Sequence, residues 1–103
     1  MQHFNEGTFS QAEGKGVTAL IDFYADWCGP CKMLGPIVEE LAGEVEPEVL
    51  VGKVNIDENP ALASRFGVMS IPTVIVLKDG EEKQRTVGFT SKAKLLSMIE
   101  AAK

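Results

Sequence analysis

The two cysteines of this 103-residue chain lie three positions apart, in the segment Cys28-Gly29-Pro30-Cys31. Residues three apart in the first turn of a helix have Cα atoms about 5 to 6 Å apart, within the range that a disulfide requires. The pair can therefore open and close without rebuilding the backbone. This spacing points to reversible thiol–disulfide exchange, in which two thiols and one disulfide interconvert.

The two cysteines are expected to have different roles. At the start of a helix, Cys28 would face unpaired backbone N–H groups and the positive end of the helix dipole, and both favour a thiolate over a thiol. Cys28 is therefore the candidate nucleophile. Cys31 lies further into the helix and is expected to be more shielded, which suits the group that resolves a mixed disulfide. Gly29 and Pro30 would set the backbone geometry and the access to sulfur.

Other readings of the pair stay open. A purely structural disulfide would close a very short loop and stabilise the fold by only about 2 kcal/mol. A zinc site within the chain normally needs four ligands, but the single histidine, His3, is far away in sequence. A metal carrier in which two chains contribute four cysteines is a further alternative, and metal retention under reducing conditions would reveal it. With two cysteines and one distant histidine, the sequence favours no bound metal.

The surrounding pattern predicts an α/β layer fold, because apolar runs alternate with segments of helical periodicity. We expect a helix to follow the cysteines and to kink at Pro36, which lacks a backbone donor. Ser91 should cap the last helix. Strands are expected at 17–24, 49–56, 73–77 and 82–87, with a short edge strand at 2–4, a short helix from 59 to 66 that Gly67 ends, and a turn at Asp79-Gly80.

Size and composition limit the class of protein. The length predicts a single domain over residues 1–103, and 45% hydrophobic residues suit a folded globular chain. A net charge of −5 with scattered basic residues argues against a nucleic-acid partner. The apolar runs are too short to span a membrane. Residues 1–12 lack the features of a secretory signal, so we expect a cytoplasmic, reducing compartment. A monomer is also expected.

Two charged residues lie inside strands that are otherwise apolar. Burial of Asp22 would raise the pKa of its carboxyl and make it a candidate proton carrier near neutral pH. A solvent-facing position for Asp22 is the alternative. Lys53 occupies a second predicted central strand, where a lone ammonium is unfavourable. Lys53 either couples to Asp22 or extends its charge to the surface.

The chain contains the segments Ile21-Asp22-Phe23-Tyr24-Ala25-Asp26-Trp27-Cys28-Gly29-Pro30-Cys31-Lys32, Pro36, Lys53-Val54-Asn55-Ile56-Asp57-Glu58-Asn59-Pro60, Ile71-Pro72-Thr73, Lys78-Asp79-Gly80 and Val87-Gly88, in this order. Through these segments it resembles the thioredoxin family over essentially its whole length. The resemblance implies a thioredoxin fold, with a five-stranded mixed central sheet flanked by four helices. It also implies a protein-disulfide reductase that carries electrons to target proteins in cell redox homeostasis. Thioredoxin reductase, which uses NADPH, would recharge it, and no cofactor would be bound besides the redox-active disulfide.

The resemblance also assigns roles to residues. It implies that Asp22 exchanges a proton with the inner cysteine and that Lys53 neighbours this aspartate. It implies a cis peptide bond before Pro72, although most such bonds are trans, so that the backbone of Ile71 can pair with an extended substrate. The implied docking face for target proteins consists of Trp27, Gly29, Pro30, Ile71, Pro72, Val87 and Gly88. Trp27 as a packing aromatic and Gly88 as a simple strand end are the alternatives.

The chain departs from the common family pattern at three positions near the expected site. These are Tyr24, where many members have tryptophan, Ser70, often glycine, and Phe89, often a smaller residue. The last two flank the docking face and bear on partner choice. Met33 and Met69 are interpreted as packing residues. A rival function is a docking module without catalysis, which would bind through the apolar face around Cys28 and Pro72.

Overall fold

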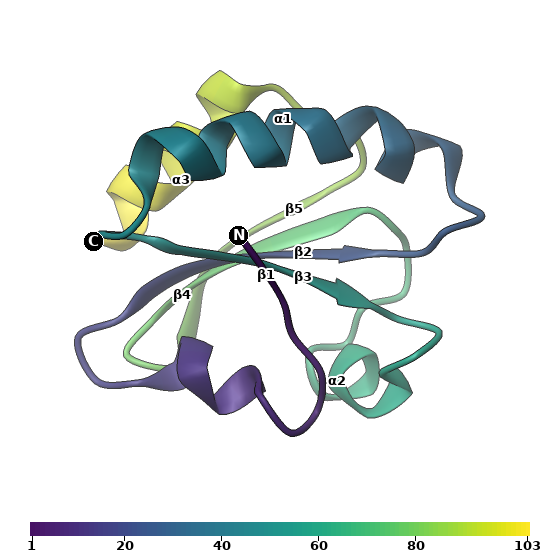
Figure 1. Cartoon of the computed structure of the whole chain (residues 1–103), viewed down its shortest axis with the longest axis horizontal. Coiled ribbons are helices and arrows are strands. Elements are labelled where there is room, and N and C mark those ends of the chain that lie inside the picture. Colours follow the sequence, from purple (N-terminus) through teal and green to yellow (C-terminus); the bar gives the residue numbers. More distant parts are fainter.

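The computed structural model describes residues 1–103. A five-stranded sheet forms the centre of the molecule, with helices on both of its faces (Figure 1). The elements in chain order are β1 (Gln2–His3), the 3₁₀ helix η1 (Phe9–Glu13), β2 (Thr18–Tyr24), α1 (Gly29–Val45), β3 (Leu50–Asn55), α2 (Pro60–Arg65), β4 (Thr73–Lys78), β5 (Glu81–Val87) and α3 (Lys92–Ala102).

The sheet is mixed, and β2 lies at its centre. The spatial order is β1-β3-β2-β4-β5, in which β1 and β2 each pair with β3 in parallel. The pairs β2–β4 and β4–β5 are antiparallel. The register between β2 and β3 places Asp22 opposite Lys53, so the two charged residues of the sheet interior are direct neighbours.

Each face of the sheet has its own hydrophobic core, because side chains alternate along a strand. On one face, Leu20 of β2 packs with Leu34 and Leu41 of α1 and with Leu95 of α3. On the other face, buried residues of β2 and β4 pack with Phe4, Phe9 and Ala12 near the N-terminus and with Leu62 of α2. Helices α1 and α3 lie together above the sheet in Figure 1, and η1 and α2 lie below it.

Local signals in the sequence explain where several elements begin and end. Ser91 accepts a hydrogen bond from the Lys94 backbone N–H at 3.1 Å and so caps α3, as predicted. Asp79 and Gly80 have φ angles of 54° and 78° between β4 and β5. Two consecutive positive φ angles make the turn that matches the twist of a two-residue hairpin. Gly67 follows α2 with a φ of 62°, also as predicted.

The helices differ in one respect from the four that the resemblance implies. Three are α-helices, and the fourth helical segment is η1, a single 3₁₀ stretch of five residues. Gly7 and Gly14 stand close to its two ends, and Thr8 provides no side-chain cap. So short a segment closes with the tighter i→i+3 bonds, as in the hydrogen bond from the Gln11 N–H to the Thr8 carbonyl.

The start of α2 also departs from the capping pattern that Asn59-Pro60 indicates. Asn59 occupies the N-cap position but makes no side-chain cap. Its amide oxygen instead accepts from the Glu6 N–H at 3.2 Å, and its amide nitrogen donates to the Asn55 carbonyl at 3.2 Å. The side chain therefore ties the N-terminal segment to the end of β3.

Helix α1 runs without a break from Gly29 to Val45 and contains Pro36 in its interior. The kink predicted at Pro36 stays a prediction. None of the helices combines the length and the apolar character that crossing a membrane requires.

Candidate redox site

The Cys28–Cys31 pair lies where the loop after β2 enters α1. Its Cα atoms are 5.3 Å apart, and the two sulfurs form a disulfide. Cys28 is the N-cap residue of α1, and its Sγ accepts a hydrogen bond from the Cys31 backbone N–H at 3.2 Å. The predicted position of Cys28 at the helix start is therefore confirmed. In the reduced protein, the same N–H and the helix dipole favour a thiolate at Cys28.

The two cysteines do not differ in burial, contrary to the expectation that Cys31 is the more shielded. Their exposed fractions are 5% and 4%. They differ in their neighbours instead. The Cys28 sulfur lies 3.7 Å from the carbonyl oxygen of Ile71, on the side of the predicted docking face. Cys31 lines a pocket on the other side, beneath α1.

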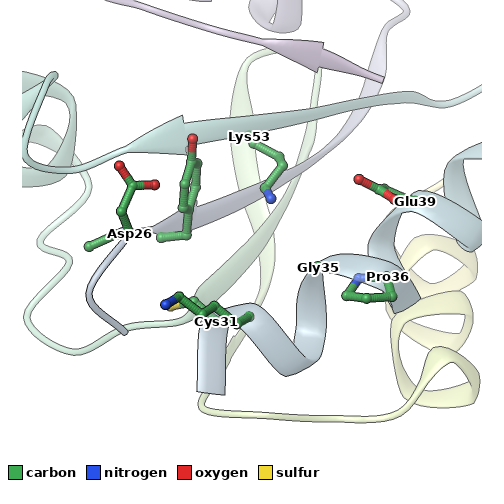
Figure 2. Close-up of a pocket in the computed structure, with 9 residues that line it drawn as sticks. Asp26, Cys31, Gly35, Pro36, Glu39 and Lys53 are labelled. Carbon is green, nitrogen blue, oxygen red and sulfur yellow. The ribbon is translucent and has the colours of Figure 1, made fainter. Parts of the chain in front are cut away.

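This pocket measures about 430 Å³ and opens between α1 and the ends of β2 and β3. Figure 2 shows Lys53 reaching from β3 toward α1, which carries Cys31, Gly35 and Glu39. The pocket thus brings one redox cysteine close to the strand pair that holds Asp22 and Lys53. Its lining residues are Tyr24, Ala25, Asp26, Cys31, Lys32, Gly35, Pro36, Glu39 and Lys53.

Asp22 is fully buried, which rules out the solvent-facing alternative. Neither of its carboxylate oxygens has a hydrogen-bond partner. Burial raises the pKa of Asp22 from 3.8 to about 6, and the positive charge of Lys53 offsets part of this increase. The carboxyl therefore changes its protonation state close to neutral pH, which is the property that a proton carrier needs.

Lys53 is half-buried and does not form a direct ion pair with Asp22. Its Nζ lies 4.4 Å from the centre of the Tyr24 ring. The same Nζ lies 3.7 Å from where a Cβ on Gly35 would stand. The ammonium thus occupies the pocket below α1. Both hypotheses from the sequence describe part of this arrangement, because the charge lowers the pKa of Asp22 and the side chain also extends toward an opening.

Two loops meet beside Cys28. The Ile71–Pro72 peptide bond is cis, as the resemblance implies. The Gly88 N–H donates to the Pro72 carbonyl at 2.7 Å, and the Thr73 hydroxyl donates to the Ser70 carbonyl at 2.5 Å. Ile71 itself makes no hydrogen bond to another backbone group. Its N–H and C=O therefore have no backbone partner, and the carbonyl oxygen faces the Cys28 sulfur.

The side chains around these loops form an exposed apolar surface. Trp27 is 68% exposed and Val87 is 58% exposed, while Ile71 is partly covered and Pro72 is buried. Pro72 therefore contributes its backbone rather than its side chain. The exposure of Trp27 argues against a mainly packing role. Met33 and Met69 are also exposed, so the interpretation of these methionines as packing residues is wrong.

Sequence reasoning assigned no role to two residues that the structure places at the site. The Asp57 carboxylate accepts a hydrogen bond of 2.8 Å from the Trp27 indole N–H and so orients the largest apolar side chain beside Cys28. Tyr24 departs from the common family pattern, and its ring contacts the Lys53 ammonium. Burial and the neighbouring Asp26 raise the pKa of Tyr24, so its phenol stays neutral. No local pattern predicts either contact, because both join separate strands and loops.

The structure contains no group of three or more His, Cys, Asp or Glu side chains placed to hold a metal ion. The disulfide instead lies near one buried carboxyl, Asp22, and one half-buried lysine, Lys53. This set is suited to moving electrons and protons between sulfur atoms.

Comparison with known proteins agrees with this chemistry. The thioredoxin family model matches residues 1–101. A thioredoxin of Staphylococcus saprophyticus is 53% identical over 81 residues, 79% of this chain and 78% of that protein. A thioredoxin of Chlamydia caviae is 58% identical over 80 residues, 78% of each chain. The crystal structure of a Malassezia sympodialis thioredoxin has a TM-score of 0.86 and 34% identity, covering 99% of this chain and 90% of that one.

The fold and the site define a dithiol oxidoreductase, a protein whose paired cysteines exchange electrons with disulfides. The chain belongs to the thioredoxin family. It acts as a protein-disulfide reductase, and the family, the fold and the reaction class predicted from the sequence are confirmed.

Proposed function

We propose that Cys28 attacks and Cys31 resolves when this chain reduces a disulfide in a target protein. The observation that carries these roles is the hydrogen bond from the Cys31 N–H to the Cys28 sulfur at the start of α1. The Cys28 thiolate attacks one target sulfur, the target disulfide breaks, and a mixed disulfide forms. The Cys31 thiolate then attacks the Cys28 sulfur and releases the second target thiol. Two electrons pass to the target, and the Cys28–Cys31 disulfide remains.

Asp22 accepts the proton that Cys31 must lose before it attacks, and Lys53 tunes this carboxyl. Cys31 and Gly35 are four residues apart and so share one face of α1. The Lys53 ammonium lies close to Gly35, and Asp22 is its neighbour across the strand pair. The inner cysteine and the lysine therefore line one pocket, and the buried carboxyl of Asp22 is the register partner of that lysine. Because the pKa of Asp22 is about 6, the carboxyl is mostly ionised at neutral pH and ready to take a proton.

Target proteins bind on the docking face predicted from the sequence. The free N–H and C=O of Ile71 pair with an extended target segment, while exposed apolar groups cover its side chains. The residues of this face are Trp27, Gly29, Pro30, Ile71, Pro72, Val87 and Gly88. Ser70 and Phe89 flank the face and affect which targets fit.

The proposed electron donor of this chain follows from its family. Thioredoxin reductase supplies electrons from NADPH, and this chain passes them to target proteins as part of cell redox homeostasis. We further propose a monomer made of one domain over residues 1–103, working in the cytoplasm without nucleic-acid or membrane partners. The acidic net charge of −5 is in keeping with the lack of a nucleic-acid partner.

The central test is the reduction of insulin disulfides by dithiothreitol, followed as turbidity, with the wild-type chain and single-cysteine variants. Cys28→Ser should abolish the acceleration. Cys31→Ser should instead accumulate a mixed disulfide between Cys28 and the target, visible on a non-reducing gel. Adduct formation by Cys28→Ser and not by Cys31→Ser would reverse the two roles.

Two further measurements separate this function from its rivals. A redox titration should place the Cys28–Cys31 couple near about −270 mV, as for a reductant, rather than near about −120 mV, as for an oxidant. A Cys28→Ser, Cys31→Ser double variant that kept full biological activity would favour the docking module over catalysis.

A further inference from the structure

The two charged side chains below α1, Asp22 and Lys53, do not form an ion pair with each other. Asp22 and Lys53 are register partners in the parallel β2–β3 pair, so their side chains start next to each other on the same face of the sheet. Even so, both oxygens of the fully buried Asp22 carboxylate have no partner. Lys53 forms no ion pair with any carboxylate in the chain. Some other contact must compete for the ammonium.

The competing contact is the face of Tyr24. Tyr24 lies two residues after Asp22 on β2, so both side chains lie on the same face of the sheet. The Lys53 Nζ lies 4.4 Å from the ring centre, within the range in which the negative face of an aromatic ring attracts a cation. Gly35 on α1 has no side chain and leaves room for the ammonium above the ring.

We propose that Tyr24 is a positioning residue for proton transfer, whose ring holds the Lys53 ammonium in the pocket and prevents a direct ion pair with Asp22. The inference rests on the proposed exchange of a proton between Asp22 and Cys31. A lysine bound directly to Asp22 would keep the carboxyl ionised and would weaken it as a proton acceptor. The ring therefore preserves the ability of Asp22 to take up a proton near neutral pH.

Other charged groups around the pocket offer Lys53 weaker alternatives. Asp26 follows β2, Lys32 and Glu39 lie on α1, and Glu58 follows β3 near Tyr24. The carboxylates among these residues are exposed to water, which screens their attraction for the ammonium. Asp22 is buried, and charges attract more strongly where the dielectric constant is low. A lysine released from the ring should therefore move toward Asp22.

The test is a titration of the Asp22 side-chain carboxyl by ¹³C NMR in the reduced protein, with the pH profile of insulin reduction measured in parallel. Tyr24→Leu removes the aromatic face and keeps an apolar side chain, and Tyr24→Phe keeps the face. We expect Tyr24→Phe to retain the wild-type titration midpoint. Tyr24→Leu should move the midpoint to lower pH by about 1, the effect of bringing an opposite charge into contact with a carboxylate.

A background without Lys53 separates this effect from a simple change in packing. With Lys53→Met in place, Tyr24→Leu and Tyr24→Phe should have the same midpoint. Equal displacement by Tyr24→Leu with and without Lys53 would overturn the proposal, as would an unchanged midpoint with Lys53 present. If Lys53→Met alone leaves the Asp22 midpoint unchanged, the proposed tuning by Lys53 fails and the role of Tyr24 fails with it. Thermal unfolding checks each fold, and Tyr24→Met serves in place of an unstable Tyr24→Leu.

Discussion

The buried carboxyl of Asp22 should make the fold less stable as the pH rises, and Asp22→Asn should remove this loss. Folding raises the pKa of Asp22 from 3.8 to about 6, so the folded state binds this proton more tightly than the unfolded state does. Between these two pH values the folded chain retains the proton and the unfolded chain releases it. The contribution of Asp22 to the free energy of unfolding is therefore fully present below about pH 4. It falls as the pH rises and is lost above about pH 6.

The size of the loss follows from the two pKa values. Their difference corresponds to about 3 kcal/mol, an order-of-magnitude figure for the cost of an ionised and unpartnered Asp22 in the folded state. Asn has nearly the same shape and no charge. Asp22→Asn should therefore stabilise the oxidised protein by up to about 3 kcal/mol at pH 7 and by less than about 0.5 kcal/mol at pH 4.

Urea unfolding of the wild type and of Asp22→Asn, followed by circular dichroism between pH 4 and pH 8, measures this difference directly. With an m value of about 1.5 kcal/mol/M, the midpoint of the variant should rise by about 2 M at pH 7. Asp26→Asn is the matched control, because Asp26 lies two residues after the end of β2 and its side chain is exposed. A stability difference for Asp22→Asn that does not change with pH would refute the reasoning.

Three further outcomes test other parts of the structure. Gly52→Ala should destabilise the fold by about 1 to 3 kcal/mol in urea unfolding, because its Cβ would overlap the Phe4 ring; a neutral effect would contradict the close packing there. Ser91→Ala should cost about 1 kcal/mol by loss of the cap on α3, and Ser97→Ala on the same helix provides a comparison without a cap. Asp57→Ala should lower kcat/KM for insulin by about fivefold, corresponding to about 1 kcal/mol, through loss of the Trp27 hydrogen bond. An equal loss with a small-molecule disulfide would argue against a role for that bond in docking.

Much of the site could be predicted because it is local in sequence. A helix that begins directly after a strand is enough to bring Cys28 and Cys31 within reach of each other, and α1 begins at Gly29 as that pattern indicates. The burial of Asp22 followed from its position in an apolar strand. The cis bond before Pro72 was different, because the residues alone favour trans and only the family resemblance implied cis. The cis bond between Glu46 and Pro47 had no signal at all.

The amino-acid sequence by itself determined the order of the elements, the helix-start position of Cys28 and the presence of two charges in the sheet interior. These properties depend on periodicity, caps and turns, which act over a few residues. The tertiary structure decided where the charges point. Lys53 lies over Tyr24 rather than against Asp22, and Trp27 meets Asp57, because β2, β3, α1 and the loops beside them converge there. Contacts between distant segments are selected by the space and the partners that the packed fold leaves, so no short pattern encodes them.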